Sequence, residues 1–355
     1  MDPKQRRRGF EALAVAAEGD PLAMAATARL FRSDGWKEEA ADLAARSLAL
    51  APGEGEARAL AREVLSADVP AWHFAIVRDQ LRNQAYDQAL IRAIRPGSRV
   101  LDIGAGTGLL AMMAARAGAA HVFTCEMEPA VARAAREIVA ANGLADRITV
   151  LAKHSTAVDA GDLGGPVDVL VSEIVSNDMV SEGVLPVLED AIGRLVAPGG
   201  AVIPARGRVQ VALAFDARRD ARRMGVVDGF DLTAFDSLAP DVHQVATGSP
   251  HLTLRSDPVA PFEFDFASGG PWSARRNRLR VRAHGGPVNG LVQWIALDMD
   301  AVGRYENRPG PGATSCWAAL FHPFARAVES PEGAEFAIHG CQDHESLRLW
   351  SEPLF

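Results

Sequence analysis

The order of hydrophobic and polar positions divides the chain into three segments with different periodicities. Residues 1–66 are rich in alanine, and their helical spacing of apolar positions predicts amphipathic helices. Residues 67–204 alternate short apolar runs, which predict buried strands, with helical patterns. From residue 205 to residue 355, short alternating strands are separated by Pro/Gly turns, a pattern typical of an antiparallel barrel or sandwich.

The middle segment is expected to form an α/β domain. Alternation of strand and helix predicts a doubly wound, Rossmann-like parallel sheet, with ligands at the carboxyl ends of its strands. The expected strands are 99–103, 121–125, 147–152, 168–174 and 201–205, with a helix at 184–195 before the last strand.

The third segment contains one irregular stretch. Strand patterns at 208–214, 251–255, 262–266, 278–284 and 291–300 flank or follow it, and Trp294 and Trp350 are expected in the barrel core. Residues 218–247 lack this regularity and predict an arm or a helical insertion. The apolar Phe230, Leu232 and Phe235 would pack either on a partner subunit or on the barrel.

A glycine-rich turn follows the first expected strand of the α/β domain. The run RVLDI at 99–103 leads into Gly104, Gly106 and Gly108, and a helical pattern starts at once. Glycines let the backbone turn sharply and approach a ligand closely, because a side chain would collide with it. The next strand ends at Glu126, about 20 residues further on, where an acid can hold the two hydroxyls of a ribose.

The spelling of this turn favours S-adenosylmethionine as the ligand. The chain has Gly-Ala-Gly-Thr-Gly, with Asp102 inside the preceding strand and no third glycine where a dinucleotide site needs one. This spelling is typical of sites whose ligand has no pyrophosphate. A dinucleotide site and a purely structural glycine turn are the two alternative interpretations.

Composition and charge narrow the class of protein. The chain has 355 residues, a mean hydropathy of +0.01 and no long apolar run, so we expect no membrane span. The formal net charge of −8 lacks the basic excess of nucleic-acid-binding proteins, so no nucleic-acid partner is expected, whereas an acidic enzyme attracts cationic substrates. The three cysteines lack zinc spacing, which predicts no metal site and favours a reduced, cytoplasmic protein.

Two glutamates bracket a loop after the fourth expected strand. Glu173 and Glu182 lie nine residues apart in SEIVSNDMVSEG, where a substrate should meet the cofactor. Two carboxylates held together can bind one guanidinium through paired, charge-assisted hydrogen bonds. Taken alone, two loop glutamates are usually just solvated, so this prediction depends on its context.

The N-terminal helices carry a repeat-like signal. Gly35, Ala40 and Pro52 have a spacing that resembles one tetratricopeptide repeat, in which small residues allow close helix packing. About one and a half repeats fit into residues 1–66. A helical cap on the next domain and a peptide-binding module are both compatible with this pattern.

From Trp72 onward the chain resembles the protein arginine methyltransferases. The resemblance rests on the order of VLDIGAGTGLL, CEMEPA, AKHST, SEIVSNDMVSEG, GGAVIPA and Trp317 ahead of AALFHPF. Residues 72–86 are similar to the helix that closes over the cofactor, and AKHST with SEIVSNDMVSEG resembles the monomethylating branch. The repeat-like helices are similar to those of divergent members that carry tetratricopeptide repeats. The resemblance implies methyl transfer from S-adenosylmethionine to an arginine guanidino nitrogen of a protein substrate.

The resemblance also implies roles for individual residues. Arg82 matches the arginine that pairs with the methionine carboxylate of the cofactor, and Glu173 with Glu182 matches the pair that binds the substrate arginine. An arm near 218–247 is a candidate for a homodimer contact. Asp102, Gly104 and Gly106 match the loop beneath the amino-acid part, Glu126 the ribose acid, His154 and Ser155 the adenine site, and His73 a position near the cleft.

The chain departs from the family pattern at two places. The usual Thr-His-Trp turn is Ser315-Cys316-Trp317, and a neutral cysteine cannot form the ion pair that the histidine makes with the acid at the position of Asp79. We interpret Cys316 as a packed thiol, with a redox thiol as the alternative. A tyrosine pair expected shortly before Trp72 is also absent. These departures leave two other functions open: a methyltransferase acting on another amine, and a cofactor-binding interaction protein that barely turns over.

Overall fold

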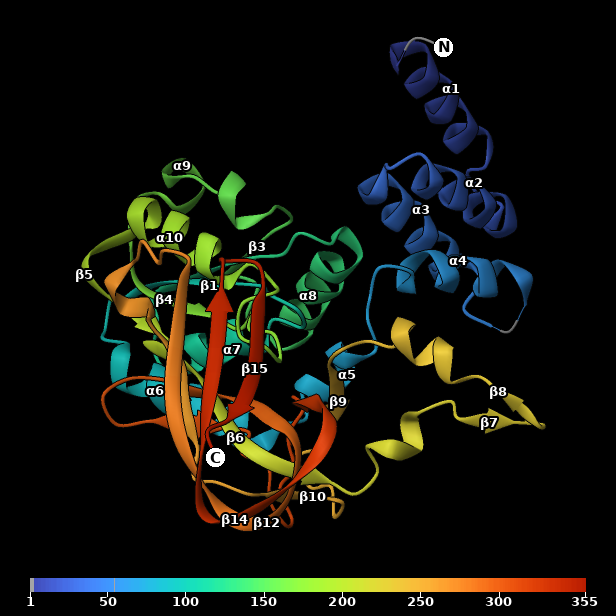
Figure 1. The fold of residues 1–355 in the computed structure, drawn as a ribbon. Coiled ribbons are helices and arrows are strands. Elements are labelled where there is room, and N and C mark those ends of the chain that lie inside the picture. The colour runs from blue at the N-terminus through green and yellow to red at the C-terminus, as the bar shows by residue number, and fades with distance from the viewer. Residues whose placement is uncertain (1–2, 54) are drawn as a thin grey trace.

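The computed structural model describes residues 3–53 and 55–355, which form an α/β domain, a β domain and a set of N-terminal helices (Figure 1). The predicted fold class, a Rossmann-like sheet followed by an antiparallel barrel, is confirmed. The N-terminal helices are α1 (Pro3–Ala16), α2 (Pro21–Ser33), α3 (Lys37–Leu50) and α4 (Glu56–Ser66).

The N-terminal helices pack on one another and touch the α/β domain through charged side chains. Met24, Ala28 and Phe31 of α2 lie in their shared core. From α3, Lys37 Nζ binds Glu128 Oε1 at 2.9 Å, directly before the helix α8 (Pro129–Ala141). Figure 1 shows these helices standing beside the body of the molecule. The repeat-like interpretation of this segment stays a prediction.

The α/β domain is built on a parallel five-stranded sheet in the order β3-β2-β1-β4-β5. Strand β5 starts at Val196, earlier than predicted, because the Pro-Gly-Gly segment is taken into the strand with an irregular register. Apolar side chains from both faces of the sheet form the core of the domain. The strands are β1 (Arg99–Ile103), β2 (His121–Cys125), β3 (Ile148–Leu151), β4 (Val167–Ser172) and β5 (Val196–Ile203).

The helices of the α/β domain occupy the connections between its strands. Two helices, α5 and α6, precede the sheet, and α6 contacts both β5 of the sheet and β13 of the barrel. The helices are α5 (Trp72–Ile76), α6 (Gln80–Ala93), α7 (Leu109–Arg116), α8, α9 (Ala160–Leu163) and α10 (Val184–Leu195).

The β domain is an antiparallel sheet in the order β10-β6-β12-β14-β15, with β11 on β6, β13 on β12 and β9 on β14. Its two central strands each span 24 residues. The strands are β6 (Arg206–Asp216), β9 (His243–Val245), β10 (Leu252–Leu254), β11 (Val259–Asp265), β12 (Arg275–Asp298), β13 (Arg304–Glu306), β14 (Ala319–Gln342) and β15 (Leu347–Pro353).

Two sequence expectations for the barrel were wrong. The runs at 278–284 and 291–300 belong to the single strand β12, because the Gly285-Gly286 segment stays paired with β14 instead of turning; the register shifts lie beside it, between Arg282 and His284 and between Val288 and Gly290. Trp294 is fully buried, as expected. Trp350 is 41% exposed and stacks on His339, its partner across β15 and β14, because the register of β15 turns it outward.

Most of the stretch 218–247 forms an arm that projects from the barrel on the side of the N-terminal helices, while its end returns to the barrel as β9, which pairs with β14 (Figure 1). It contains the short strands β7 (Val226–Val227) and β8 (Phe230–Asp231) and the 3-10 helix η3 (Thr233–Leu238). Phe230 is 71% exposed and Leu238 72% exposed, so these apolar side chains do not pack on the barrel.

Within the described residues, none of the helices has the length and apolar character to cross a membrane.

Candidate active site

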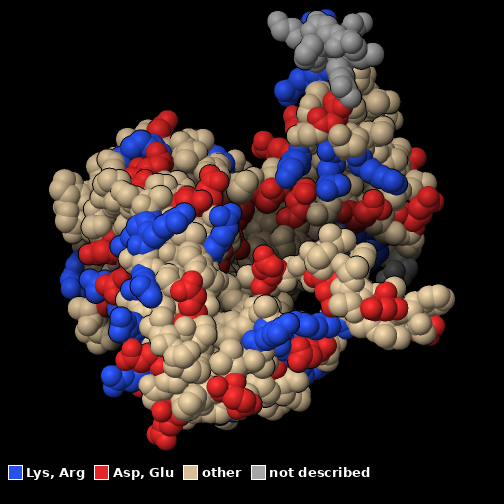
Figure 2. Space-filling view, viewed as in Figure 1, with Lys and Arg blue, Asp and Glu red and all other residues tan. Residues whose placement is uncertain are grey.

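A cavity of about 400 Å³ lies at the carboxyl ends of the central parallel strands. The chain after β1, β2, β3 and β4 contributes to its wall, together with α5 and α6. In Figure 2 the surface is hollowed between the body and the N-terminal helices, with acidic side chains along the border. Nine of the residues singled out from the sequence line this cavity: His73, Arg82, Gly104, Gly106, Glu126, His154, Ser155, Glu173 and Glu182.

The turn after β1 is shaped by two glycines. Gly104 has φ +86°, and a Cβ there would stand 2.7 Å from Cγ2 of Ile174. Gly106 has φ +52°, and the space around its missing Cβ is open for 4 Å. The Gly106 N–H donates to Glu126 Oε2 at 3.0 Å, which fixes the acid of β2 against the turn. Both oxygens of Glu126 are held, since the N–H of Glu128 donates to Oε1 at 3.0 Å.

Asp102 lies beneath the turn, in the core rather than on the cavity wall. Thr124 Oγ1 donates to Asp102 Oδ2 at 2.8 Å, while Oδ1 is buried without a partner. Burial raises the pKa of Asp102 to about 7, because a carboxylate loses the hydration that stabilises its charge. Asp102 does not line the cavity, and its role in cofactor binding stays a prediction.

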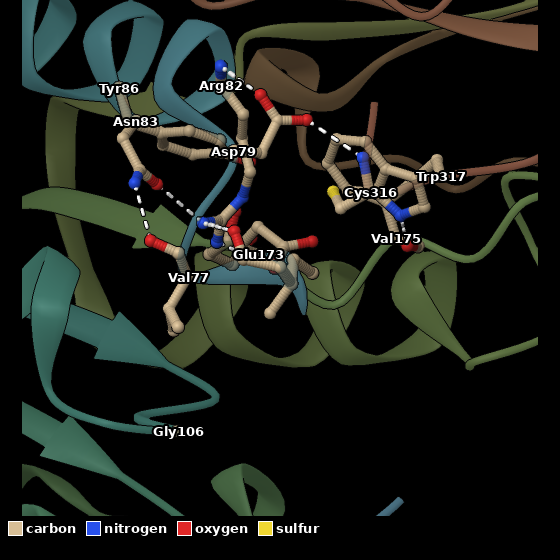
Figure 3. Close-up of polar contacts among 12 residues, drawn as sticks. Val77, Asp79, Arg82, Asn83, Tyr86, Gly106, Glu173, Val175, Cys316 and Trp317 are labelled. Atoms are coloured by element: carbon tan, nitrogen blue, oxygen red, sulfur yellow. Dashed lines mark hydrogen bonds and ion pairs between the residues drawn. The ribbon is translucent and has the colours of Figure 1, made fainter. Parts of the chain in front are cut away.

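Arg82 is a buried arginine at the start of α6 that points to the acidic loop (Figure 3). Its Nη2 binds Glu173 Oε2 at 2.8 Å, and its Nη1 donates to Ile76 O and to Asn83 Oδ1. The guanidinium lies over the ring of Tyr86, whose hydroxyl donates to the carbonyl of Ser172. Arg82 Nε has no partner, so the side chain retains one donor that no protein group satisfies.

Glu173 and Glu182 face the same cavity from the two ends of their loop. Burial raises the pKa of Glu173 to about 7, and the nearby Glu182 adds to the rise although Arg82 opposes it. Burial likewise raises the pKa of Glu182, against the attraction of His73. Between them Met179 is fully buried at φ +84°, a strained conformation that holds the loop in one shape.

Asp79 and the turn at 315–317 lie behind Arg82 rather than on the cavity wall. Asp79 caps α6 by accepting from the N–H of Arg82, and its other oxygen accepts from the N–H of Cys316 at 3.0 Å. Trp317 Nε1 donates to the carbonyl of Val175 at 3.0 Å (Figure 3). Burial raises the pKa of Cys316 to about 12, so its thiol is neutral near pH 7.

Tyr305 is the residue near this site that the sequence did not indicate. Its hydroxyl donates to Asp79 Oδ2 at 2.8 Å and lies 2.6 Å from Ser315 Oγ. Tyrosine is rare in this chain, which has only two, and that rarity was the one available signal. Its approach to Asp79 depends on the packing of β13 against α6, which no local pattern encodes.

The cavity fits S-adenosylmethionine on its own polar groups. Arg82 Nε and Ser155 Oγ are buried polar atoms without partners, and Glu126 presents a carboxylate where a ribose would lie. His154 caps the short 3-10 helix Ser155–Ala157 and also faces the cavity. Among the described residues, no group of three or more His, Cys, Asp or Glu side chains could hold a metal ion.

Comparisons with known proteins show which family the chain belongs to. The chain is 39% identical over 281 residues to an arginine N(omega)-methyltransferase of Streptomyces achromogenes subsp. streptozoticus, covering 78% of this chain and 77% of that protein. It is 34% identical over 252 residues to protein arginine N-methyltransferase 7 of Oryza sativa subsp. indica, covering 64% of this chain but only 35% of that relative. The chain therefore spans about a third of the length of the rice protein.

Solved structures share the fold of the chain, and a family model matches part of it. The structure is similar to the Trypanosoma brucei PRMT1 enzyme-prozyme heterotetrameric complex with AdoHcy, with a TM-score of 0.72, 21% identity and coverage of 82% of this chain and 95% of that chain. It is also similar to Arabidopsis thaliana protein arginine methyltransferase 10, with a TM-score of 0.66, 16% identity and coverage of 81% and 99%. The model for ribosomal protein L11 methyltransferase (PrmA) matches residues 84–205, the region of the parallel sheet. The chain belongs to the protein arginine methyltransferase family, and it is an enzyme that transfers a methyl group from S-adenosylmethionine to a guanidino nitrogen of arginine.

Proposed function

We propose that the acceptor is an arginine side chain of a protein and that Glu173 and Glu182 bind its guanidinium. The observation that carries the proposal is that both carboxylates line one cavity with the glycine turn and the ribose acid Glu126. An acidic pair on the wall of a cavity favours a planar cation, because each carboxylate can accept two parallel N–H bonds.

The cofactor side of the cavity is assigned to residues with free or exchangeable polar groups. Arg82 would hold the carboxylate of S-adenosylmethionine, Glu126 its ribose hydroxyls, and Ser155 with His154 its adenine. When bound, this cofactor supplies an electrophilic methyl group on a sulfonium. The protein's task is then to hold the acceptor nitrogen in line with that methyl group.

The two glutamates also address the low reactivity of the acceptor. A guanidinium is a poor nucleophile because its positive charge is spread over three nitrogens and its pKa exceeds about 12. Carboxylates on two of its edges draw the charge toward two nitrogens and leave lone-pair character on the third. Fixed negative charges in a site that excludes water also stabilise the cationic product.

The experiment replaces Glu173 with Gln and measures methyl-arginine formation on an arginine-rich peptide by mass spectrometry. We expect a loss of roughly 100-fold or more in kcat, since a charge aimed at the transition state is removed. Affinity for S-adenosylhomocysteine, measured by calorimetry, should be retained or improved, because Arg82 is released from its ion pair at 2.8 Å.

The matched control is Glu332→Gln, which removes the same charge from an exposed position on β14. This variant should keep full activity. Methylation by the Glu173→Gln variant at the parental rate would show that Glu173 does not bind the acceptor.

Free arginine is the second candidate acceptor. It is favoured by the 39% identical Streptomyces relative, whose name specifies arginine without specifying protein. The same mass-spectrometric assay with free arginine in place of the peptide separates the two candidates. Methylation of free arginine alone would assign the activity to the small molecule.

The arm at 218–247 supports a homodimer. Its exposed apolar side chains include Val226, Phe230, Phe235 and Leu238, which gather on one projecting segment. A concentration of exposed apolar side chains on one segment is typical of an interaction site. A second copy of this chain is the proposed occupant, with each arm contacting the other subunit in an isologous interface.

A further inference from the structure

We infer that Tyr305 is a positioning residue for the cofactor and acceptor sites, acting from the barrel through Asp79. Tyr305 lies on β13 and is buried, and its hydroxyl donates to Asp79 Oδ2 at 2.8 Å. Asp79 in turn is the N-cap of α6, the helix that carries Arg82. The inference rests on the proposed role of Arg82 in cofactor binding.

The link begins with the charge of Asp79. Burial by itself would raise the pKa of Asp79, but hydrogen bonds from the N–H groups of Arg82 and Cys316 and from the Tyr305 hydroxyl hold it below its usual value. Asp79 is therefore an ionised acceptor at neutral pH. A neutral phenol that donates to a partly buried carboxylate makes one of the stronger hydrogen bonds available in a protein.

Tyr305 stays neutral at every pH at which the enzyme is handled. Burial raises its pKa, and the neighbouring Asp79 raises it further because a second negative charge there would be repelled. The neutral phenol keeps its proton and so remains a hydrogen-bond donor to Asp79. The hydrogen bond between the barrel and α6 is therefore not lost by ionisation of Tyr305 as the pH rises above neutrality.

The Tyr305 hydroxyl also contacts the turn at 315–317. It lies 2.6 Å from Ser315 Oγ, which accepts from the N–H of Trp317 at 3.0 Å. The Tyr305 ring packs edge-on against Trp317, with 5.4 Å between the ring centroids. Trp317 Nε1 donates to Val175 O, two residues after Glu173.

Tyr305 thus connects two elements whose side chains meet in the cavity, namely α6 with Arg82 and the loop after β4 with Glu173. Through Asp79, Tyr305 fixes the start of α6 and hence Arg82. Through its contact with Trp317, it fixes the chain after Glu173. The ion pair of Arg82 and Glu173 joins the two elements that these contacts fix. Loss of the phenol hydroxyl should loosen both residues without opening a cavity, since a phenylalanine ring retains the packing.

The test is Tyr305→Phe, with binding of S-adenosylhomocysteine measured by calorimetry and methyl transfer measured separately. We expect binding to weaken roughly tenfold, the scale of one lost hydrogen bond to a charged group, and kcat to fall as well. The melting temperature should change by only a few degrees. The matched control is Ser351→Ala. It removes a hydroxyl on the outer strand β15 that donates to the carbonyl of Ala337, and it should change neither binding nor kcat.

A second variant asks whether the donor itself matters. In Tyr305→Phe/Cys316→His, a histidine side chain would start from the residue whose N–H already reaches Asp79 at 3.0 Å. Asp79 should raise the pKa of this imidazole, so the ion pair is present below that pKa and is lost as pH rises through it. We therefore expect recovery of binding that is larger at pH 6 than at pH 8, relative to the parent at each pH.

Unchanged S-adenosylhomocysteine binding and kcat in Tyr305→Phe would overturn the inference. A loss that no donor at position 316 recovers at either pH would also overturn it, because the defect would then be one of packing. A parent protein that does not bind S-adenosylhomocysteine would instead contradict the cofactor site. The two failures are therefore distinguishable.

Discussion

Two cations would compete for the carboxylate of Glu173: Arg82 and the proposed acceptor arginine. In this structure its Oε2 is bound by Arg82 at 2.8 Å, whereas the proposed function assigns Glu173 to the acceptor and Arg82 to the cofactor carboxylate. A carboxylate placed beside Arg82 would compete for the same guanidinium. If the two residues act as proposed, cofactor binding would free Glu173 for an incoming arginine, and the burial of both side chains would make that exchange energetically significant.

The raised pKa of Glu173 predicts the pH dependence of the reaction. Burial places this pKa at about 7 in the free enzyme, and only the ionised form can bind a guanidinium. The value of kcat/KM for the acceptor should therefore rise with pH through about 7 and level off above it. Initial rates at low acceptor concentration between pH 5.5 and pH 9, buffered at constant ionic strength (about 0.1 M), measure this profile.

The corresponding effect on stability has the opposite sign. Because the folded pKa of Glu173 is raised from 4.5 to about 7, the contribution of this group to stability is full below 4.5 and is lost as pH rises toward 7.

A kcat/KM that is flat from pH 5.5 to pH 8 would contradict the assignment of Glu173 as the acceptor-binding carboxylate.

At the scale of one element, the turn between β1 and α7 is the most constrained part of the site. Gly104 combines a φ of +86° with a neighbour, Cγ2 of Ile174, that would stand 2.7 Å from an added Cβ. Ile174 is β-branched and directly follows Glu173, so it has little rotamer freedom to move away. A side chain at position 104 would push on the acidic loop as well as on the turn.

We predict that Gly104→Ala destabilises the protein by more than about 2 kcal/mol and abolishes binding of S-adenosylhomocysteine. Chemical denaturation and calorimetry measure the two effects. Gly143→Ala is the matched control, because Gly143 has φ +69° but no atom within 4 Å of an added Cβ. The control should lose only the roughly 1–2 kcal/mol of a left-handed residue and keep its ligand affinity. Equal losses in the two variants would show that the contact with Ile174 is unimportant.

At the scale of the whole molecule, the arm leaves apolar side chains without a partner inside the subunit. Phe230 and Leu238 are each more than two-thirds exposed on a segment that projects from the barrel (Figure 1). Burial of such side chains in a second subunit would stabilise a dimer by about 25 cal/mol for each Å² of apolar surface removed from water.

We predict a dimer for the parent chain and a monomer for the double variant Phe230→Ser/Leu238→Ser, measured by light scattering coupled to gel filtration. Val302→Ser provides the control, because Val302 is as exposed as the arm residues but lies next to β13. This control should remain a dimer. A parent chain that is monomeric at micromolar concentration would refute the dimer.

The sequence by itself determined those features that depend on neighbours along the chain. The periodicity of residues 99–116 defined β1, the glycine turn and α7, because strand, turn and helix each have a local signature. The order of motifs likewise placed Glu126, Glu173 and Glu182 at the ends of parallel strands or in the loops after them, where a common cavity follows from the topology.

Only the tertiary structure decided the features that join distant segments. The Gly-rich part of β12 was interpreted as a turn between strands, because bulges and turns use the same residues and differ only in their strand partners. Trp350 was expected in the core, although the register of β15 turns it outward. The contact of Tyr305 with Asp79 spans 226 residues, so it exists only because the barrel packs against α6.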